Sequence, residues 1–332
     1  MTDLTRRKLM LATGVVAATG TSTWSPLAQA QNQWPASTRV VVPFPAGGGV
    51  DIVIRKINES LSKVLGTNMV VDNRPGAQGV IAVNNIKQAA PDGSTLLYVS
   101  SGFLTLQALG GNIDLFKDMT MVTKTTSSPH ALVVSAKSPF RNFRELVAAA
   151  QAKPGKLTYA SGGIGTSVHL MFETLKASIP GGFDVLHVPF KASGAAPMAI
   201  MAGDVDFTFL LGAVAAPFIA KEGGLRAIGQ TGTKRMSMLA NIPTIAEQGV
   251  PGYSNAPWGG IALPPGASPE IVARLFRALK TTYELPEILQ FTDSTGASIG
   301  LNSSPAEMVA EVRAELPAML ALIKKLGLKL ES

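Results

Sequence analysis

The sequence contains no cysteine and only three histidines among its 332 residues. Without cysteine there are no disulfides, thiolate metal sites, cysteine nucleophile or lipidated N-terminal cysteine. His130, His169 and His187 are too dispersed to predict a metal site, and the i, i+4 pair His169 and Glu173 lacks an HExxH context. No GxSxG elbow is present either. We therefore expect no catalytic residues, no metal and no cofactor.

Charged residues are also scarce, at 15% of the chain, and the formal net charge is +7. The basic residues form no run longer than Lys324-Lys325 and are not interleaved with aromatic residues, so we expect no nucleic-acid partner. The modest positive excess favours the approach of small anions. After residue 30, no apolar stretch is long enough to span a membrane.

The first thirty residues have the pattern of an export signal. The basic segment Thr5–Met10 is followed by a run rich in Ala, Gly and Val, and Ala28 and Ala30 provide the small residues of a cleavage site. Its adjacent arginines resemble the twin-arginine type. The alternative interpretation is a buried helix. We exclude residues 1–30 from the fold and expect a soluble, non-lipidated protein in the periplasm.

From Trp34 onward, short apolar runs alternate with helical patterns, which predicts an α/β fold with mostly parallel sheets flanked by helices. The length of the chain favours two domains. We expect domain 1 to comprise residues 31–128 together with 259–332, and domain 2 to comprise residues 129–258. The loop predicted for residues 251–260 would return the chain to domain 1. Pro317 predicts a kink in the last helix.

A glycine-rich turn connects the apolar strand Val40–Val42 to a helix predicted over Ile52–Leu65. Its glycines should leave bare peptide N–H groups at the positive end of the helix, which suits a carboxylate or phosphate. The spacing matches neither a P-loop nor a dinucleotide fingerprint. The alternative is a tight turn without a ligand, in which glycine only supplies positive φ. Phe44 would then lie either in the core or in the pocket wall.

The same pattern recurs at Ser161–Ser167, where a strand leads through glycines and hydroxyls into a helix that carries His169. Two such turns, far apart in the sequence, predict two domains that each direct a helix N-terminus at one cleft. His169 either packs in the core or hydrogen-bonds the turn. Ser100 and Ser101 follow another strand, at the end where α/β sheets bind ligands. Lys191 is either solvated or faces the ligand.

Several motifs in fixed order resemble the substrate-binding receptors of tripartite tricarboxylate transporters, the Bug family of periplasmic proteins. The resemblance covers essentially the whole chain after the signal. The motifs are Val42–Asp51 with Arg55, Asn73–Gly79, Ala90–Leu97, Tyr159–Leu170, His187–Lys191, Gly203–Phe207 and Ala256–Gly260.

The resemblance implies a Venus-flytrap fold of two α/β domains that close on a small ligand. In that family the two glycine turns hold one carboxylate of the ligand through backbone N–H groups and ordered water. Here the turns are residues 45–49 and 162–167. The ligand-binding residues that it implies are Phe44, Pro45, Ala46, Gly47, Gly48, Asp51, Ser100, Ser101, Thr126, Ser161, Gly163, Ile164, Gly165, Thr166, Ser167, His169, Lys191 and Leu211.

Two departures from the family pattern bear on the ligand. Val50 replaces a frequent threonine or serine, and Leu210 and Leu211 lie near a position where an aspartate often appears. We therefore expect a carboxylate with an apolar or aromatic body. The predicted function is a monomeric periplasmic receptor, not an enzyme, that passes this ligand to membrane transporter subunits or a sensor. The alternative is an exported hydrolase that uses the same cleft.

Overall fold

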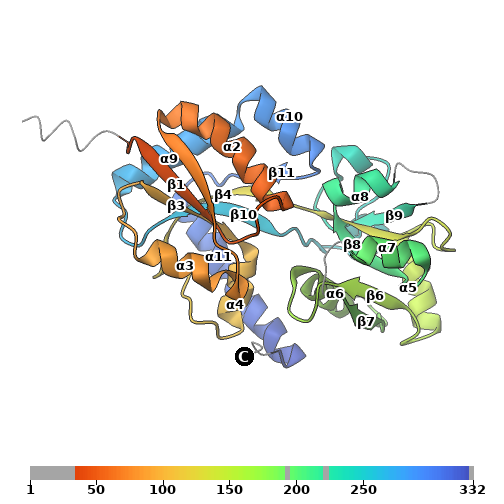
Figure 1. Cartoon of the computed structure of the whole chain (residues 1–332). Helices are drawn as coiled ribbons and strands as arrows, with labels where there is room; N and C mark the ends of the chain where they lie inside the picture. The colour runs from red at the N-terminus through yellow and green to blue at the C-terminus, as the bar shows by residue number, and fades with distance from the viewer. Residues whose placement is uncertain (1–33, 191–194, 220–223, 329–332) are drawn as a thin grey trace, which may run out of the picture. The chain divides into compact units, whose positions relative to one another are not determined.

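Figure 1 shows a computed structural model of the chain, which describes residues 34–190, 195–219 and 224–328. The predicted export signal and Lys191 lie outside the described residues. Trp34–Ser332 form one unit by their contacts. This unit contains two β-sheets, one of six strands and one of five.

The six-stranded sheet is built from β1 (Ser37–Val42), β2 (Asn68–Asn73), β3 (Thr95–Ser100), β4 (Thr120–Ser127), β10 (Trp258–Leu263) and β11 (Ser298–Ile299). The strand order is β11-β4-β10-β3-β1-β2. β1 is parallel to β2 and β3, whereas β10 is antiparallel to β3 and β4, and β11 is antiparallel to β4. The sheet therefore joins N-terminal and C-terminal parts of the chain.

The five-stranded sheet is built from β5 (His130–Ser135), β6 (Thr158–Ser161), β7 (Leu186–Pro189), β8 (Phe207–Leu211) and β9 (Leu225–Gln230). The order is β7-β6-β8-β5-β9. β6 is parallel to β7 and β8, and β5 is antiparallel to β8 and β9. Both sheets are thus mixed.

The α-helices are α2 (Gly49–Leu65), α3 (Val80–Lys87), α4 (Ser101–Ala108), α5 (Phe143–Ala152), α6 (Ser167–Ser178), α7 (Ala195–Ala202), α8 (Gly212–Ile219), α9 (Pro269–Tyr283), α10 (Pro286–Ser294) and α11 (Pro305–Leu326). Short 3₁₀ turns are η1 (Ala77–Gly79), η2 (Ser237–Leu239) and η3 (Ala246–Gln248). Asn142, Ser268 and Ser304 cap α5, α9 and α11 with their side chains.

Each sheet is covered on both faces, which explains its continuous apolar strands. In β1, Val40 and Val42 pack with residues of α2 and α9, while Val41 packs with residues of α3, α4 and α11. In β5, Leu132 packs toward α5 and α6, while Val133 packs toward α7 and α8. Successive strand residues point to opposite faces, so Val40–Val42 of β1 and His130–Val134 of β5 are all buried.

The predicted α/β fold class with two sheets is confirmed, but the expectation of mostly parallel sheets is wrong. Antiparallel pairing enters through β5 in one sheet and through β4, β10 and β11 in the other. β10 begins at Trp258, inside the stretch predicted to be a loop. The domain boundaries and the kink at Pro317 stay predictions, although Pro317 does lie within α11.

Gly259 offers a test of packing between β10 and β3. A Cβ atom at this position would overlap the hydroxyl of Tyr98, which is buried and whose pKa burial raises to about 12. We expect Gly259→Ala to lower the free energy of unfolding by about 2 kcal/mol, because overpacking a filled core forces neighbours to move. Urea denaturation measures this difference. The control is Gly300→Ala, whose Cβ would meet only ordinary contacts of 3.5 Å and longer; equal losses in both variants would contradict the packing argument.

Candidate functional site

The first glycine turn is organised by Asp51, whose side chain is almost completely buried. Its Oδ2 accepts hydrogen bonds from the Gly47 amide at 2.9 Å and from Arg55 Nε at 2.8 Å. Its Oδ1 accepts one from Asn73 Nδ2 at 2.9 Å, and Asn73 also donates to the Phe44 carbonyl at 3.0 Å. Asp51 therefore fixes the turn from inside rather than facing a ligand.

These bonds correct the expectation of bare glycine amides for Gly47 and Gly48. The Gly47 amide is used by Asp51, and the Gly48 amide donates to the Pro45 carbonyl at 3.3 Å. Gly48 is the N-cap of α2 and supplies no side-chain cap. The first amides of α2 have no intrahelical partner, because intrahelical bonds begin at Ile52 N. The first turn of α2 can therefore offer amides to an anion.

The charge of Asp51 is stabilised by its donors. Hydrogen bonds from Arg55 and then from the Gly47 amide lower its pKa to about 2, from an ordinary 3.8. A carboxylate with a lowered pKa contributes stability above its unfolded pKa and loses that contribution as pH falls through its folded pKa. The window for Asp51 is therefore between pH about 4 and about 2.

Asp51→Asn tests this account. The amide keeps the shape but removes the charge, so we expect the free energy of unfolding at pH 7 to fall by about 2 kcal/mol. The gap between the native protein and the variant should shrink as pH drops from about 4 to about 2, because Asp51 itself becomes protonated there. Chemical denaturation at pH 7 and between pH about 4 and about 2 measures the difference in free energy of unfolding at each pH. A gap that stays constant with pH would show that the charge of Asp51 has no part in holding the turn.

The second glycine turn is also held by side chains. The Gly163 amide donates to Ser161 Oγ at 3.1 Å, and the Gly165 amide donates to His169 Nδ1 at 3.2 Å. Thr166 Oγ1 donates to the Gly163 carbonyl at 2.7 Å. The sequence left two roles open for His169, packing in the core or hydrogen-bonding the turn. It has both, because its side chain is 7% exposed and accepts the Gly165 amide.

His187 is a residue of this network that sequence reasoning missed. It lies on β7 beside β6, and its Nε2 is 2.6 Å from Ser161 Oγ. Its ring stacks on Tyr159 at 4.9 Å between ring centres and lies 4.7 Å from the ring of His169. The available signal in the sequence was the position of His187 in the motif His187–Lys191, because the family resemblance includes this motif but assigned His187 no role.

Both histidines of the network are held neutral. Burial is the main cause that lowers the pKa of His169, and Lys176 lowers it further against the opposing effect of Glu173. Burial also lowers the pKa of His187, followed by the neighbouring His169. Because Nδ1 of neutral His169 accepts from the Gly165 amide, the ring proton sits on Nε2. The third histidine, His130, is separate and buried in β5, where burial lowers its pKa to about 4.

Two further helix starts near these turns lack the caps that their residues could provide. Thr166 and Ser100 are the N-caps of α6 and α4, and neither side chain accepts a bond from its helix. The first intrahelical bond of α6 is donated by Leu170 N, so the amides of its first turn have no partner within the helix. Uncapped first turns carry partial positive charge and can accept an anion.

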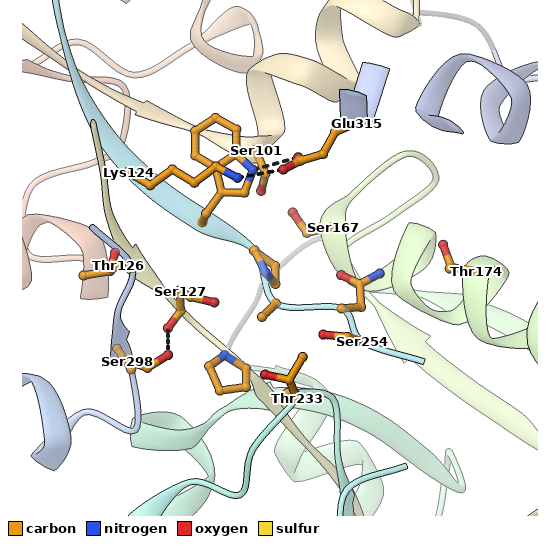
Figure 2. Close-up of a pocket in the computed structure, with 18 of the residues that line it drawn as sticks. Ser101, Lys124, Thr126, Ser127, Ser167, Thr174, Thr233, Ser254, Ser298 and Glu315 are labelled. Carbon is orange, nitrogen blue, oxygen red and sulfur yellow. Dashed lines mark hydrogen bonds and ion pairs between the residues drawn. The ribbon is translucent and has the colours of Figure 1, made fainter. Parts of the chain in front are cut away.

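A cavity of about 1090 Å³ brings some of these elements together. Its lining includes Ser101 at the start of α4, Thr126 on β4 and Ser167 at the start of α6, all three of them predicted site residues. Figure 2 shows these hydroxyl side chains around the cavity, with Ser127, Thr174, Thr233, Ser254 and Ser298. Thr126 is 6% exposed and shares a hydrogen bond with Tyr98.

The other described site residues do not line this cavity. Pro45, Ala46 and Gly47 are exposed, and Phe44 is half-buried with its ring edge-on to Tyr98 at 6.2 Å. Two apolar candidates lie at the surface, Ile164 at 62% and Leu211 at 38% exposure. The remaining ones outside the lining are Gly48, Asp51, Ser100, Ser161, Gly163, Gly165, Thr166 and His169.

Three cavity residues that the sequence did not single out form a charged cluster. They are Lys124 on β4, Trp258 at the start of β10 and Glu315 on α11. Trp258 belongs to the quoted motif Ala256–Gly260, which is the signal that could have found it. Lys124 and Glu315 lie in stretches without a motif, and only the fold brings them together.

The chain can now be compared with known proteins. A model of the family described as tripartite tricarboxylate transporter family receptor matches residues 53–328. The chain belongs to this receptor family. It is 33% identical over 303 residues to a UPF0065 protein from the tcbD-tcbE intergenic region of Pseudomonas sp. strain P51, covering 89% of this chain and 87% of that one. BugT of Bordetella pertussis is 27% identical over 299 residues, covering 88% and 90%.

Solved structures agree with the family and confirm the two-domain binding-protein fold. The periplasmic binding protein BugD superposes with a TM-score of 0.72 at 26% identity, covering 88% of this chain and 98% of BugD. Rpa4515 of R. palustris, solved with adipate, gives 0.76 at 29% identity, covering 89% and 99%. MatC of Rhodopseudomonas palustris, with bound malate, gives 0.71 at 27%, covering 86% and 98%. The receptor is therefore of the periplasmic solute-binding type.

Two searches within the described residues bear on other functions. None of the described helices combines the length and the apolar character that a membrane crossing requires. Histidine, aspartate and glutamate side chains in the described part of the chain form no group of three that could hold a metal ion.

Proposed function

We propose that this receptor captures a small carboxylate in the cavity, at the uncapped N-termini of α4 and α6. One observation carries the proposal: the same cavity is lined by Ser101 and Ser167, the first residues of α4 and α6. These two helices follow strands of different sheets. Two helix starts that converge on one space supply peptide amides and hydroxyls for the two oxygens of a carboxylate.

The geometry of the second turn supports this role. With the Gly163 and Gly165 amides tied to Ser161 and His169, the turn is rigid, and Ser167 follows directly. A rigid turn loses little conformational entropy when it binds. Rpa4515 with adipate and MatC with malate show that relatives of this fold hold carboxylates.

The first turn completes the proposed site on closure. Residues 45–47 are exposed, and the first amides of α2 lack intrahelical partners. In a Venus-flytrap receptor, such a segment meets the ligand when the domains close and exclude water. We propose that both glycine turns then contact one carboxylate, and that the exported receptor delivers its ligand from the periplasm to membrane transporter subunits or a sensor.

The hydrolase alternative draws on the short contact between Ser161 and His187. However, Ser161 is 3% exposed, lies outside the cavity lining and already hydrogen-bonds both backbone groups of Gly163. No described acidic side chain hydrogen-bonds the His187 ring to orient it as a base. This pair therefore supports the turn, and we propose that the protein is not an enzyme.

A ligand screen tests the proposal. Purified native protein is analysed by mass spectrometry for a co-purifying small molecule, and thermal shifts are recorded with monocarboxylates, dicarboxylates and amino acids. We expect carboxylates with apolar or aromatic bodies to raise the melting temperature, because bound ligand stabilises the folded state by mass action. Stabilisation by amino acids alone would reject the preference for an apolar body, and no shift with any carboxylate would reject the function.

Gly165→Val tests the role of the second turn. Gly165 has a φ of 78°, which a β-branched residue adopts only under strain, so the turn and Ser167 should shift. We expect carboxylate affinity in calorimetry to fall more than about tenfold, since displaced donors lose their geometry. The matched control is Gly203→Val, with a φ of 89°, open space around its Cβ and no place in the cavity. It should lower stability and keep affinity; equal affinity in both variants would contradict the proposed site.

A further inference from the structure

The second glycine turn depends on a ring nitrogen that can take up a proton. The Gly165 amide donates to His169 Nδ1 at 3.2 Å, and no other described group accepts a hydrogen bond from that amide. A ring nitrogen accepts a hydrogen bond only while it carries no proton, so this bond requires neutral His169. In the first turn the acceptor for Gly47 is Asp51, whose pKa of about 2 keeps it ionised. The two turns therefore respond differently to mild acid.

The charged and titratable groups around His169 come from three elements. On α6 itself, Glu173 and Lys176 form an ion pair at 3.0 Å. Tyr159 of β6 donates to Glu173 Oε1 at 3.1 Å, and the ring of His187 on β7 lies 4.7 Å from the ring of His169. These three elements lie together in Figure 1. Glu173 is already bound by two partners, so the described surroundings offer a protonated His169 no unpaired anion.

The neutral ring is the favoured form near pH 7. Burial is the main cause that lowers the pKa of His169 below its ordinary 6.5. A lowered histidine pKa means that the neutral form, and with it the Gly165 bond, is present at and above pH 6.5 and is lost as pH falls through the folded pKa. After protonation an Nδ1–H group would face the Gly165 N–H group. Two donors cannot bond each other, so the turn has to move.

Protonation has two opposite effects on an anion bound nearby. An imidazolium attracts a carboxylate, but His169 is 7% exposed and lies outside the cavity lining, and the cavity at Ser167 is exposed to water and salt, which screen the attraction. Movement of the turn acts more directly, because Gly165 is only two residues before Ser167. Hydrogen bonds weaken steeply when their geometry is disturbed. Loss of geometry is therefore the larger effect.

We propose that His169 makes carboxylate binding by this receptor sensitive to acid: its neutral ring holds the second turn in place, and its protonation releases the turn and the ligand. The inference rests on the proposed carboxylate function and adds a regulation to the same site. His169 acts through the turn and does not touch the carboxylate, so it is a positioning residue.

The variant His169→Asn tests the role of the proton. Asparagine Oδ1 can take the place of Nδ1 and accept the Gly165 amide, but it does not titrate. Calorimetry with benzoate compares the native receptor and the variant at pH about 7.5 and about 4.5; if benzoate gives no thermal shift, the carboxylate with the largest shift replaces it. We expect equal affinities within about twofold at the higher pH and about fivefold tighter binding by the variant at the lower pH, since losing one hydrogen bond has this effect. Protonation of the probe itself cancels in the ratio.

His187→Gln is the matched control. Glutamine Nε2 can keep the contact with Ser161 Oγ while removing the titration of the neighbouring ring. This variant should lose affinity in acid as the native receptor does. A further measurement needs no substitution: heteronuclear NMR of the native protein follows the Gly165 amide, whose resonance should shift with the same midpoint pH as the loss of affinity.

The outcomes distinguish this inference from the function on which it rests. A ratio of affinities that is the same at both pH values, or native binding that strengthens in acid relative to His169→Asn, would overturn the inference and leave the carboxylate function standing. Loss of the acid effect in His187→Gln alone would assign the proton to the other ring and overturn it as well, as would a Gly165 resonance that stays constant while affinity falls. Absence of binding at the higher pH by benzoate and by every carboxylate of the thermal screen would overturn both.

Discussion

Side chains that accept hydrogen bonds from the glycine amides determine the shape of both glycine turns. Asp51 accepts the Gly47 amide, Ser161 accepts the Gly163 amide and His169 accepts the Gly165 amide. The partner lies within four residues of the glycine in each case, so the turns are formed locally and before any ligand arrives. The amides left for an anion are those of the first helical turns, where the partial positive charge is concentrated.

The mixed sheets explain why the starts of α4 and α6 meet at one cavity. β10 and β11 come from the C-terminal part of the chain and pair with β3 and β4, so the chain crosses between the two sheets more than once. Because each sheet is covered on both faces, its strands are held rigidly, and the helices that follow β3 and β6 begin at fixed positions. That packing fixes the positions of Ser101 and Ser167, and both therefore line the same cavity.

Local patterns in the sequence predicted those structural features that depend on residues close together in the chain. The two glycine turns and the buried strand Val40–Val42 both follow from residues a few positions apart. The antiparallel strand β10 could not be predicted in this way, because Trp258-Gly-Gly resembles a loop until Tyr98 and β4 are placed beside it. The contact between Lys124 and Glu315 could not be predicted for the same reason, since the two residues are 191 positions apart in the sequence.

A receptor that must release its ligand benefits from holding it without a full opposing charge. Peptide dipoles at helix starts stabilise a carboxylate by fractions of the energy that a buried ammonium would supply, so the complex can be specific and still dissociate. The cavity contains such an ammonium, Lys124, but two glutamates already neutralise it. The pairing of Lys124 therefore leaves the proposed carboxylate to the peptide amides at the starts of α4 and α6, whose partial charges hold it weakly enough for release.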